Sequence, residues 1–203
     1  METSLQPAAL AAFPAALADD VCAVTQTVPE AHLQPAGSCS AWVDGEQLTI
    51  PYRLYNREPD EDLGANLSAV QAKILHCLYT RHHDGRVRQR HLGQIIDATD
   101  PWIAPFVVQL IGEYVLDIVI SIKDGLADLD LRGSPHHQAY GRFAADNPAF
   151  LFLTSQRVAS YWDRYYRNRF PHRIYPGRIL IDSLQDAGAT YAKSANGHRN
   201  TAE

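Results

Sequence analysis

A long apolar run constrains the fold more than any other feature of this chain. Residues 103–122, IAPFVVQLIGEYVLDIVISI, are almost continuously apolar and long enough to cross a bilayer as a helix. Gln109, Glu113 and Asp117 stand in the middle of the run, and a central carboxylate costs about 2.5–3.5 kcal/mol on membrane insertion. A helix that is apolar on nearly every side is otherwise the central helix of a domain core. We therefore expect 103–122 to be one buried helix and not a membrane span.

A β-hairpin is expected at 39–55. Asp44 and Gly45 stand between two β-prone runs, and this pair favours the two-residue turn in which both positions need positive φ. Pro51 cannot donate to a strand ladder, so its strand should lie at an edge. Alternate residues of the second run share an apolar face, as a half-buried strand requires: Leu48, Ile50, Tyr52 and Leu54.

After an acidic linker at 56–66, the apolar period becomes helical. Asp84-Gly85 and Asn147-Pro148 are typical helix boundaries. The expected helices are 67–83, 86–96, 103–122 and 148–168, with one last strand at 178–182. The fold class is thus mainly α (α+β), with four or five helices around the buried central helix and a small antiparallel hairpin at the edge.

The length of 203 residues favours a single domain with loose ends. We expect an Ala/Pro-rich, weakly ordered leader at 1–37, a globular domain at 38–186 and a disordered tail at 187–203. Whether the leader is removed stays open. An odd number of cysteines without a CxxC motif is typical of a reducing compartment, which predicts a soluble cytoplasmic protein. The cysteines are Cys22, Cys39 and Cys77.

The charge is segregated along the chain. The net charge is −5, yet residues 81–91 hold four arginines against one aspartate, and residues 157–178 hold six against one. By contrast, residues 1–62 carry ten acids and two bases. The negative net charge argues against a general nucleic-acid coat, whereas the two basic segments indicate local binding surfaces or internal ion pairs.

The first basic segment, RHHDGRVRQRH, should place its arginines on different sides of a helix. At 100° per residue, Arg88 and His91 fall on the same half as Val87, whereas Arg86 and Arg90 fall outside it. A buried arginine needs a partner. Since Glu113 and Asp117 interrupt the apolar run four residues apart, we predict a buried ion-pair network. Its members are Arg88, His91, Glu113 and Asp117.

The second basic segment belongs to the helix expected at 148–168. Its arginines share the face opposite an apolar stripe, so they are expected to contact a partner or phosphate. The aromatic residues Trp162, Tyr165 and Tyr166 stand at helical spacing on the stripe, which favours a core position. The predicted partner or phosphate contacts are Arg86, Arg90, Arg157, Arg164 and Arg167.

The sequence contains no familiar catalytic or metal-binding motif that would indicate a function. The sequence lacks GxSxG, a P-loop, GxGxxG and HExxH, and we predict no cofactor or metal. Adjacent histidines diverge along a backbone, so His82-His83 and His136-His137 are expected to be exposed loop residues, although metal binding by either pair stays open.

Three functions follow, in order of preference. The first is an uncharacterised non-enzymatic protein-protein interaction or structural module, which uses its arginine faces on an unknown partner or in self-association. The second is a nucleic-acid-binding protein, winged-helix-like or helical, that contacts phosphates, although the third helix of such a domain would carry the wrong side chains for base recognition. The third is an acid/base hydrolase around Glu113, Asp117 and His91.

Overall fold

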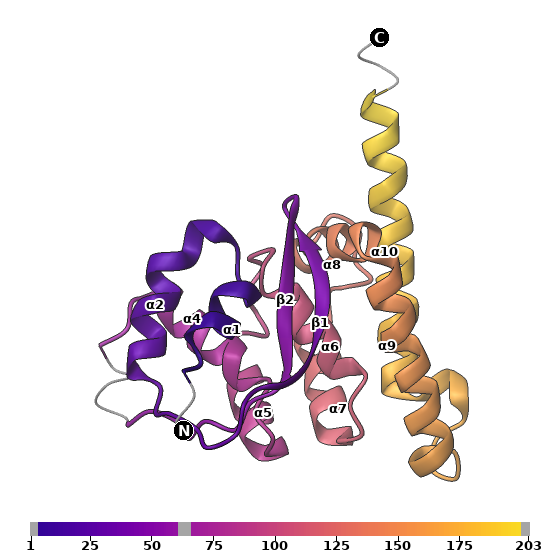
Figure 1. Ribbon diagram of the computed structural model, residues 1–203. Coiled ribbons are helices and arrows are strands. Elements are labelled where there is room, and N and C mark those ends of the chain that lie inside the picture. Colours follow the sequence, from indigo (N-terminus) through magenta and orange to yellow (C-terminus); the bar gives the residue numbers. More distant parts are fainter. Residues whose placement is uncertain (1–3, 61–65, 200–203) are drawn as a thin grey trace. The chain divides into compact units, whose positions relative to one another are not determined.

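The computed structural model describes residues 4–60 and 66–199. These residues are mainly helical, with one two-stranded antiparallel sheet, as the sequence predicts (Figure 1). The chain divides into two compact units, Met1–Ile95 and Ile96–Glu203. The single domain expected over 38–186 includes residues of both units. Among the described residues, none of the helices combines the length and the apolar character that a membrane span requires.

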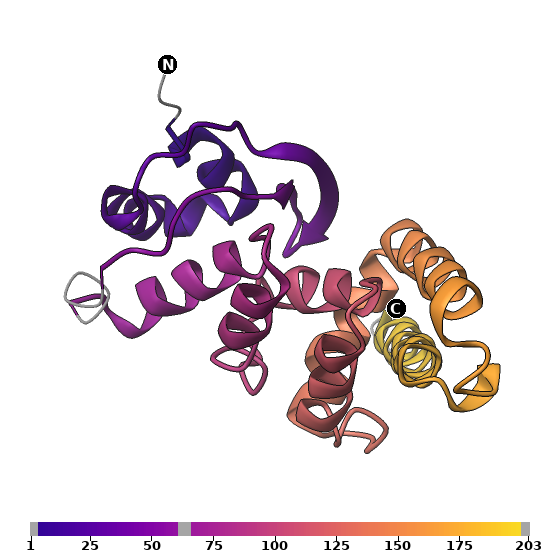
Figure 2. The same ribbon diagram turned by 90° about the horizontal axis from the view of Figure 1, so that it is seen from below.

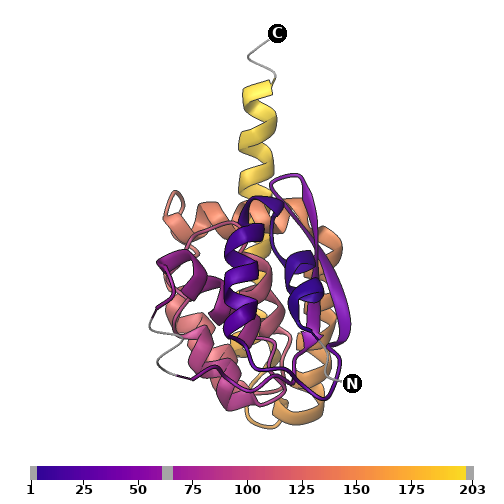
Figure 3. The ribbon, with the colours of Figure 1, turned by 60° about the vertical axis from the view of Figure 1, so that its left-hand side comes forward.

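The first unit contains a hairpin and short helices. Its elements are α1 (Gln6–Ala12), η1 (Ala15–Leu17), α2 (Ala18–Thr27), β1 (Ala36–Val43), β2 (Glu46–Arg53), α4 (Ala69–Tyr79) and α5 (Gly85–Leu92). Helix α1 packs on β2, while α2 packs on α4 (Figures 2 and 3). Ala9, Ala12 and Val21 are fully buried. The region expected to be a weakly ordered leader therefore contributes α1 and α2 to the core of this unit.

The hairpin matches the prediction closely. Val43 pairs with Glu46 across the turn, and both turn residues have positive φ, 52° at Asp44 and 87° at Gly45. Leu48 is buried on the inner face, as the alternation predicts. Both strands of a two-stranded sheet are edges, which accommodates the proline in β2. Residues 61–65 of the expected acidic linker lie outside the described residues.

The second unit is built around a short buried helix. Its elements are α6 (Ala104–Ile111), α7 (Leu116–Gly125), α8 (Pro135–Asp146), α9 (Pro148–Tyr161), the π-helix η2 (Trp162–Tyr166), the 3-10 turn η3 (His172–Ile174) and α10 (Pro176–Arg199). Every residue of α6 is buried. Helix α10 packs on α8, and the two approach closely because Gly141 faces the backbone of Ala187.

The prediction of one helix over 103–122 is wrong. The run forms α6 and α7, which are separated at residues 112–115. Helix α6 ends at Gly112. This glycine packs closely against Arg157, because a Cβ at position 112 would lie only 3.2 Å from the Cβ of the arginine. Val115 is extended, and Asp117 stands in the first turn of α7, where a negative charge favours a helix start. Two short helices thus bury the apolar run.

The strand expected at 178–182 is wrong as well. These residues lie in α10, which begins at Pro176, a favoured first helical residue. Leu180, Ile181, Leu184 and Ala187 are buried, and this spacing is helical and not alternating. Of the tail expected at 187–203, residues 187–199 continue α10, and 200–203 lie outside the described residues.

Candidate functional site

The basic cluster, defined as residues 81–91, folds inward in the first unit. The Asp84 carboxylate accepts a hydrogen bond from the Arg86 backbone N–H at 2.8 Å and caps α5. Arg88 is 1% exposed, and its Nη1 donates to the carbonyl oxygens of His82 at 2.9 Å and His83 at 3.0 Å. The helical period therefore predicts the inward side of Arg88 correctly, and the guanidinium closes the turn between α4 and α5.

The same turn is attached to the end of β2. Arg81 is fully buried, and its Nε donates to Thr80 Oγ1 at 3.2 Å. The Leu54 backbone N–H donates to the Arg81 carbonyl oxygen at 2.8 Å, and the His83 N–H donates to the Leu54 carbonyl oxygen at 2.9 Å. Arg81 and Arg88 thus occupy structural positions in the joint between hairpin and helices.

A carboxylate–imidazole–imidazole chain stands beside this joint. His91 Nε2 lies 2.7 Å from Glu58 Oε1, and His91 Nδ1 lies 2.8 Å from His76 Nδ1. Burial lowers the pKa of His91, and the Glu58 carboxylate offsets this only in part. Burial, together with the nearby His91 charge, lowers the pKa of His76 to about 4. His76 is consequently neutral at neutral pH, and burial favours the neutral form of His91 as well.

The sequence analysis did not identify Glu58, which supplies the carboxylate of the carboxylate–imidazole–imidazole arrangement. Burial opposes its ionisation, but hydrogen bonds from Arg90 and His91 outweigh this and hold its pKa below the ordinary value. Tyr79 stacks on His91 with ring centroids 4.9 Å apart, and burial raises the pKa of its phenol. Because Glu58 lies in an acidic stretch without apolar periodicity, no sequence signal separated it from its neighbours.

The predicted ion-pair network stays a prediction. Arg88 and His91 belong to the first unit, whereas Glu113 and Asp117 belong to the second. Glu113 is buried between α6 and α7, while Asp117 is exposed on α7. Within the first unit, Arg88 donates to backbone carbonyls and His91 contacts Glu58.

The second basic region is an arginine–aromatic segment, defined as residues 161–174. Helix α9 passes into the π-helix η2 at Trp162, and no residue of η2 is buried. A π-turn adds a residue to the helical repeat and rotates the following side chains. Trp162 and Tyr166 are half-buried and Tyr165 is 60% exposed, so the core position expected for these three residues is wrong.

The aromatic side chains of this segment support one another near the surface. Trp162 Nε1 donates to the Phe170 carbonyl oxygen at 2.9 Å. Tyr166 stacks on Tyr175 with centroids 5.6 Å apart, and Tyr165 stacks on Tyr161 at 6.2 Å. Burial raises the pKa of Tyr175 to about 12. The buried Tyr175 ring thus anchors a layer of partly exposed rings.

The arginines of the second region differ in accessibility. Arg157 is half-buried against Gly112, and Arg167 is exposed and pairs with Asp163 at 3.3 Å. Arg164 and Arg173 are exposed, and neither has an acidic partner among the described residues. The exposed arginine surface is therefore formed by residues 164–173, and Arg157, which was expected to belong to it, does not.

The two remaining predicted contacts lie in the first unit. Arg86 is exposed beside the α5 cap, where its backbone binds Asp84. Arg90 is exposed and pairs with Glu58. Both face outward, as the helical period predicts, but Arg90 already has an acidic partner.

The described residues contain no group of three or more His, Cys, Asp or Glu side chains arranged to hold a metal ion. His82 is buried and His83 is exposed, and their rings contact each other. His136 Nδ1 lies 2.5 Å from Asp128 Oδ1. The buried positions of His82, His136 and His137 differ from the exposed loop positions expected for them.

Comparisons with known proteins give no relative: no family model, no curated protein and no solved structure matches this chain. The geometry of the two basic regions is the observation that bears on function.

Proposed function

We propose that this chain is a non-enzymatic interaction module that binds an acidic segment of a partner protein through the arginine–aromatic segment. The observation that carries the proposal is the exposure of Tyr165 between arginines that have no acidic partner among the described residues, Arg164 and Arg173. Arginine, tyrosine and tryptophan are the residues most enriched at the energetic centres of protein interfaces.

The support for the aromatic rings makes this surface suitable for binding. Tyr165 contacts a ring of α9 and Tyr166 contacts the ring of Tyr175, which directly precedes α10, so both are held in place before a partner arrives. A side chain that is already ordered loses less entropy when it is buried in an interface. The arginines supply charge complementarity to carboxylates, which gives a fast and specific encounter.

Single-stranded nucleic acid is the second candidate partner, and Tyr165 is the observation that favours it. Proteins that bind single strands combine a basic surface with exposed aromatic rings on which bases stack. The segment offers the largely exposed ring of Tyr165 among its arginines. Its neighbouring rings are half-buried and stack on other protein rings, and this favours the protein partner over a run of stacked bases.

Fluorescence anisotropy tests the proposal with two probes in parallel. The first is a labelled peptide of alternating glutamate and tryptophan, and the second is labelled oligothymidine. The test variant carries Arg164→Ala and Arg173→Ala. The control variant carries Arg57→Ala and Lys123→Ala, which removes the same charge from exposed positions outside the segment.

We expect the peptide to bind at low salt and the test variant to bind it about tenfold more weakly, because each exposed charge contact contributes up to about 1 kcal/mol. The control variant should stay within about twofold of the parent protein. Absence of peptide binding at low salt, or equal loss in both variants, would contradict the proposal. Tighter binding to oligothymidine, with a steep linear salt dependence, would favour the nucleic-acid function instead.

A further inference from the structure

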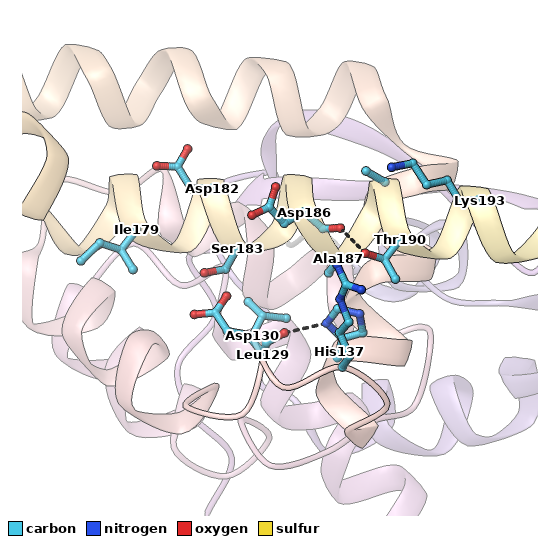
Figure 4. A pocket seen from close by; sticks show the side chains of 12 residues that line it. Leu129, Asp130, His137, Ile179, Asp182, Ser183, Asp186, Ala187, Thr190 and Lys193 are labelled. Atoms are coloured by element: carbon cyan, nitrogen blue, oxygen red, sulfur yellow. Dashed lines mark hydrogen bonds between the residues drawn. The ribbon is translucent and has the colours of Figure 1, made fainter.

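The second unit contains a cleft that the arginine–aromatic segment does not use. Its volume is about 620 Å³, and it lies between α10 and the chain that leads into α8. Figure 4 shows side chains of α10 along one wall, with Leu129, Asp130 and His137 along the other. This volume falls in the range of small-molecule sites.

The charges around the cleft are of both signs. Asp182 is already bound by Arg178, whose Nη2 lies 2.5 Å from its Oδ1. Four further charged residues line the cleft and have no ion-pair partner among the described residues: Asp130, Asp186, Arg132 and Lys193. Two carboxylates and two cations therefore border one cleft without neutralising one another. A ligand with a single sign of charge would be attracted by one pair and repelled by the other.

His137, which lines the cleft, supplies a hydrogen-bond acceptor. The side chain is 8% exposed, and its Nδ1 lies 2.9 Å from the Leu129 carbonyl oxygen. Since a carbonyl only accepts, Nδ1 carries the proton, and in a neutral ring Nε2 is a lone-pair acceptor. His137 Nε2 is buried and has no hydrogen-bond partner among the described residues. A buried acceptor without a donor costs stability, and such a group commonly marks a functional position.

The apolar part of the lining is small. Leu129 and Ala187 are buried, and Ser183 is buried beside them on α10. The cleft thus combines a short apolar base with carboxylates, cations and an imidazole acceptor. The described residues offer no metal-binding group of three or more ligands, so a bare metal ion does not fit the arrangement.

We propose that this cleft binds a small zwitterion of the α-amino-acid class. The ammonium group of the ligand donates to His137 Nε2 and to the carboxylates of Asp130 and Asp186. Its carboxylate pairs with Arg132 and Lys193. The assignment goes beyond the proposed protein interaction, because it concerns different residues and a different kind of partner.

Equilibrium dialysis against a mixture of the twenty common α-amino acids, read by mass spectrometry, tests the proposal. Any retained amino acid is then titrated by calorimetry into the full chain and into variants. Asp186→Asn and Lys193→Gln each remove one charge from an exposed position on α10, so the fold should persist. A double variant with Asp97→Asn and Lys123→Gln is the matched control, because both residues are exposed outside this cleft.

We expect at least one amino acid to bind with saturation at one site per chain. Each test variant should weaken it about tenfold, the effect of one charge-assisted hydrogen bond, whereas the control should not change affinity. Retention of no amino acid would overturn the proposal. So would an affinity that is insensitive to both Asp186→Asn and Lys193→Gln.

NMR of the imidazole ¹⁵N nuclei tests the role of His137 without any substitution. The ¹⁵N resonances of His137 should show a proton on Nδ1 in the free protein. The Nε2 resonance should shift toward the hydrogen-bonded range when the retained amino acid is added. An unchanged Nε2 resonance at saturation would overturn the role of His137. Because Arg164→Ala and Arg173→Ala leave this cleft intact, failure here is distinguishable from failure of the peptide test.

Discussion

The two basic regions are both rich in arginine, but their arginines differ in burial. In the basic cluster, Arg81 and Arg88 are almost completely buried and bind the turn between β2, α4 and α5. In the arginine–aromatic segment, Arg164 and Arg173 are exposed and have no acidic partner in the described part of the chain. The comparison shows that density of arginine in a sequence does not identify a binding surface. The side of the helix on which each arginine falls, and the acceptors within its reach, decide the outcome.

The largest expected effect tests the structural half of this comparison. Arg88→Met removes two hydrogen bonds to backbone carbonyls in a buried turn. We expect a loss of about 3 kcal/mol in the free energy of unfolding, because both carbonyl oxygens lose a charged donor. Urea denaturation followed by circular dichroism measures it. Arg86→Met, at an exposed position of the same helix, should change stability by no more than about 0.5 kcal/mol. Equal effects of the two substitutions would refute a structural role for Arg88.

The second effect tests the close packing of α8 against α10 in the unit that carries the arginine–aromatic segment. A Cβ on Gly141 would lie 2.8 Å from the Ala187 carbonyl oxygen, where α8 meets α10. Gly141→Ala should therefore destabilise the protein by about 2 kcal/mol, since the clash is with backbone that cannot move aside easily. Gly93→Ala is the control, because its added methyl meets only an ordinary contact at 3.5 Å. Thermal unfolding compares the two, and a neutral Gly141→Ala would show that the helices do not approach this closely.

The third effect is the pH dependence of the basic cluster. The pKa of His76 is about 4 in the folded protein, against 6.5 for a free side chain. As the pH falls below about 6.5, the unfolded chain takes up a proton that folded His76 does not accept, so stability decreases on acidification. The pKa of Glu58 is lowered, and protonation of its carboxylate acts in the same direction.

The variant His76→Gln should reduce the stability lost between neutral pH and about pH 5 by about 1 kcal/mol, less than the full shift because the side chain is partly exposed. Urea midpoints at the two pH values provide the measurement. His32→Gln, at an exposed position, should leave the pH dependence unchanged. If both variants lose the same stability on acidification as the parent protein, His76 does not carry the effect.

The smallest effect on stability is expected in the arginine–aromatic segment. Arg164→Ala and Arg173→Ala should each change the free energy of unfolding by no more than about 0.5 kcal/mol, because exposed arginines without an acidic partner contribute little to folding. Urea denaturation of these variants and of Arg88→Met under the same conditions compares the changes in the free energy of unfolding directly. A loss of more than about 1 kcal/mol on either substitution would mean that the segment is structural as well.

Local rules predicted the features that depend on neighbouring residues. The turn at Asp44-Gly45 follows from the φ values that these residues accept, and the burial of Arg88 and His91 follows from the 100° step of a helix. Both features are complete within a few residues, so a single sequence suffices to find them.

The features that were missed depend on contacts between distant residues. Gly112, at which α6 ends, packs closely against Arg157, which lies far along the chain. Glu58 meets His91 from a stretch without periodicity. The π-helix at Trp162–Tyr166 turns Tyr165 outward although its spacing fits a core stripe. The segment at 178–182 has β-prone residues, but burial against neighbouring helices favours α10. In each case tertiary packing outweighed local propensity.

Arginine-specific footprinting with phenylglyoxal, with and without the glutamate–tryptophan peptide, tests the central claim most directly. Peptide mapping by mass spectrometry gives the reactivity of each arginine. We predict that Arg164 and Arg173 react rapidly in the free protein and become protected by the peptide, whereas Arg81 and Arg88 stay unreactive until the protein unfolds. Reactive Arg81 and Arg88 in the folded protein, or Arg164 and Arg173 that the peptide does not protect, would contradict the account.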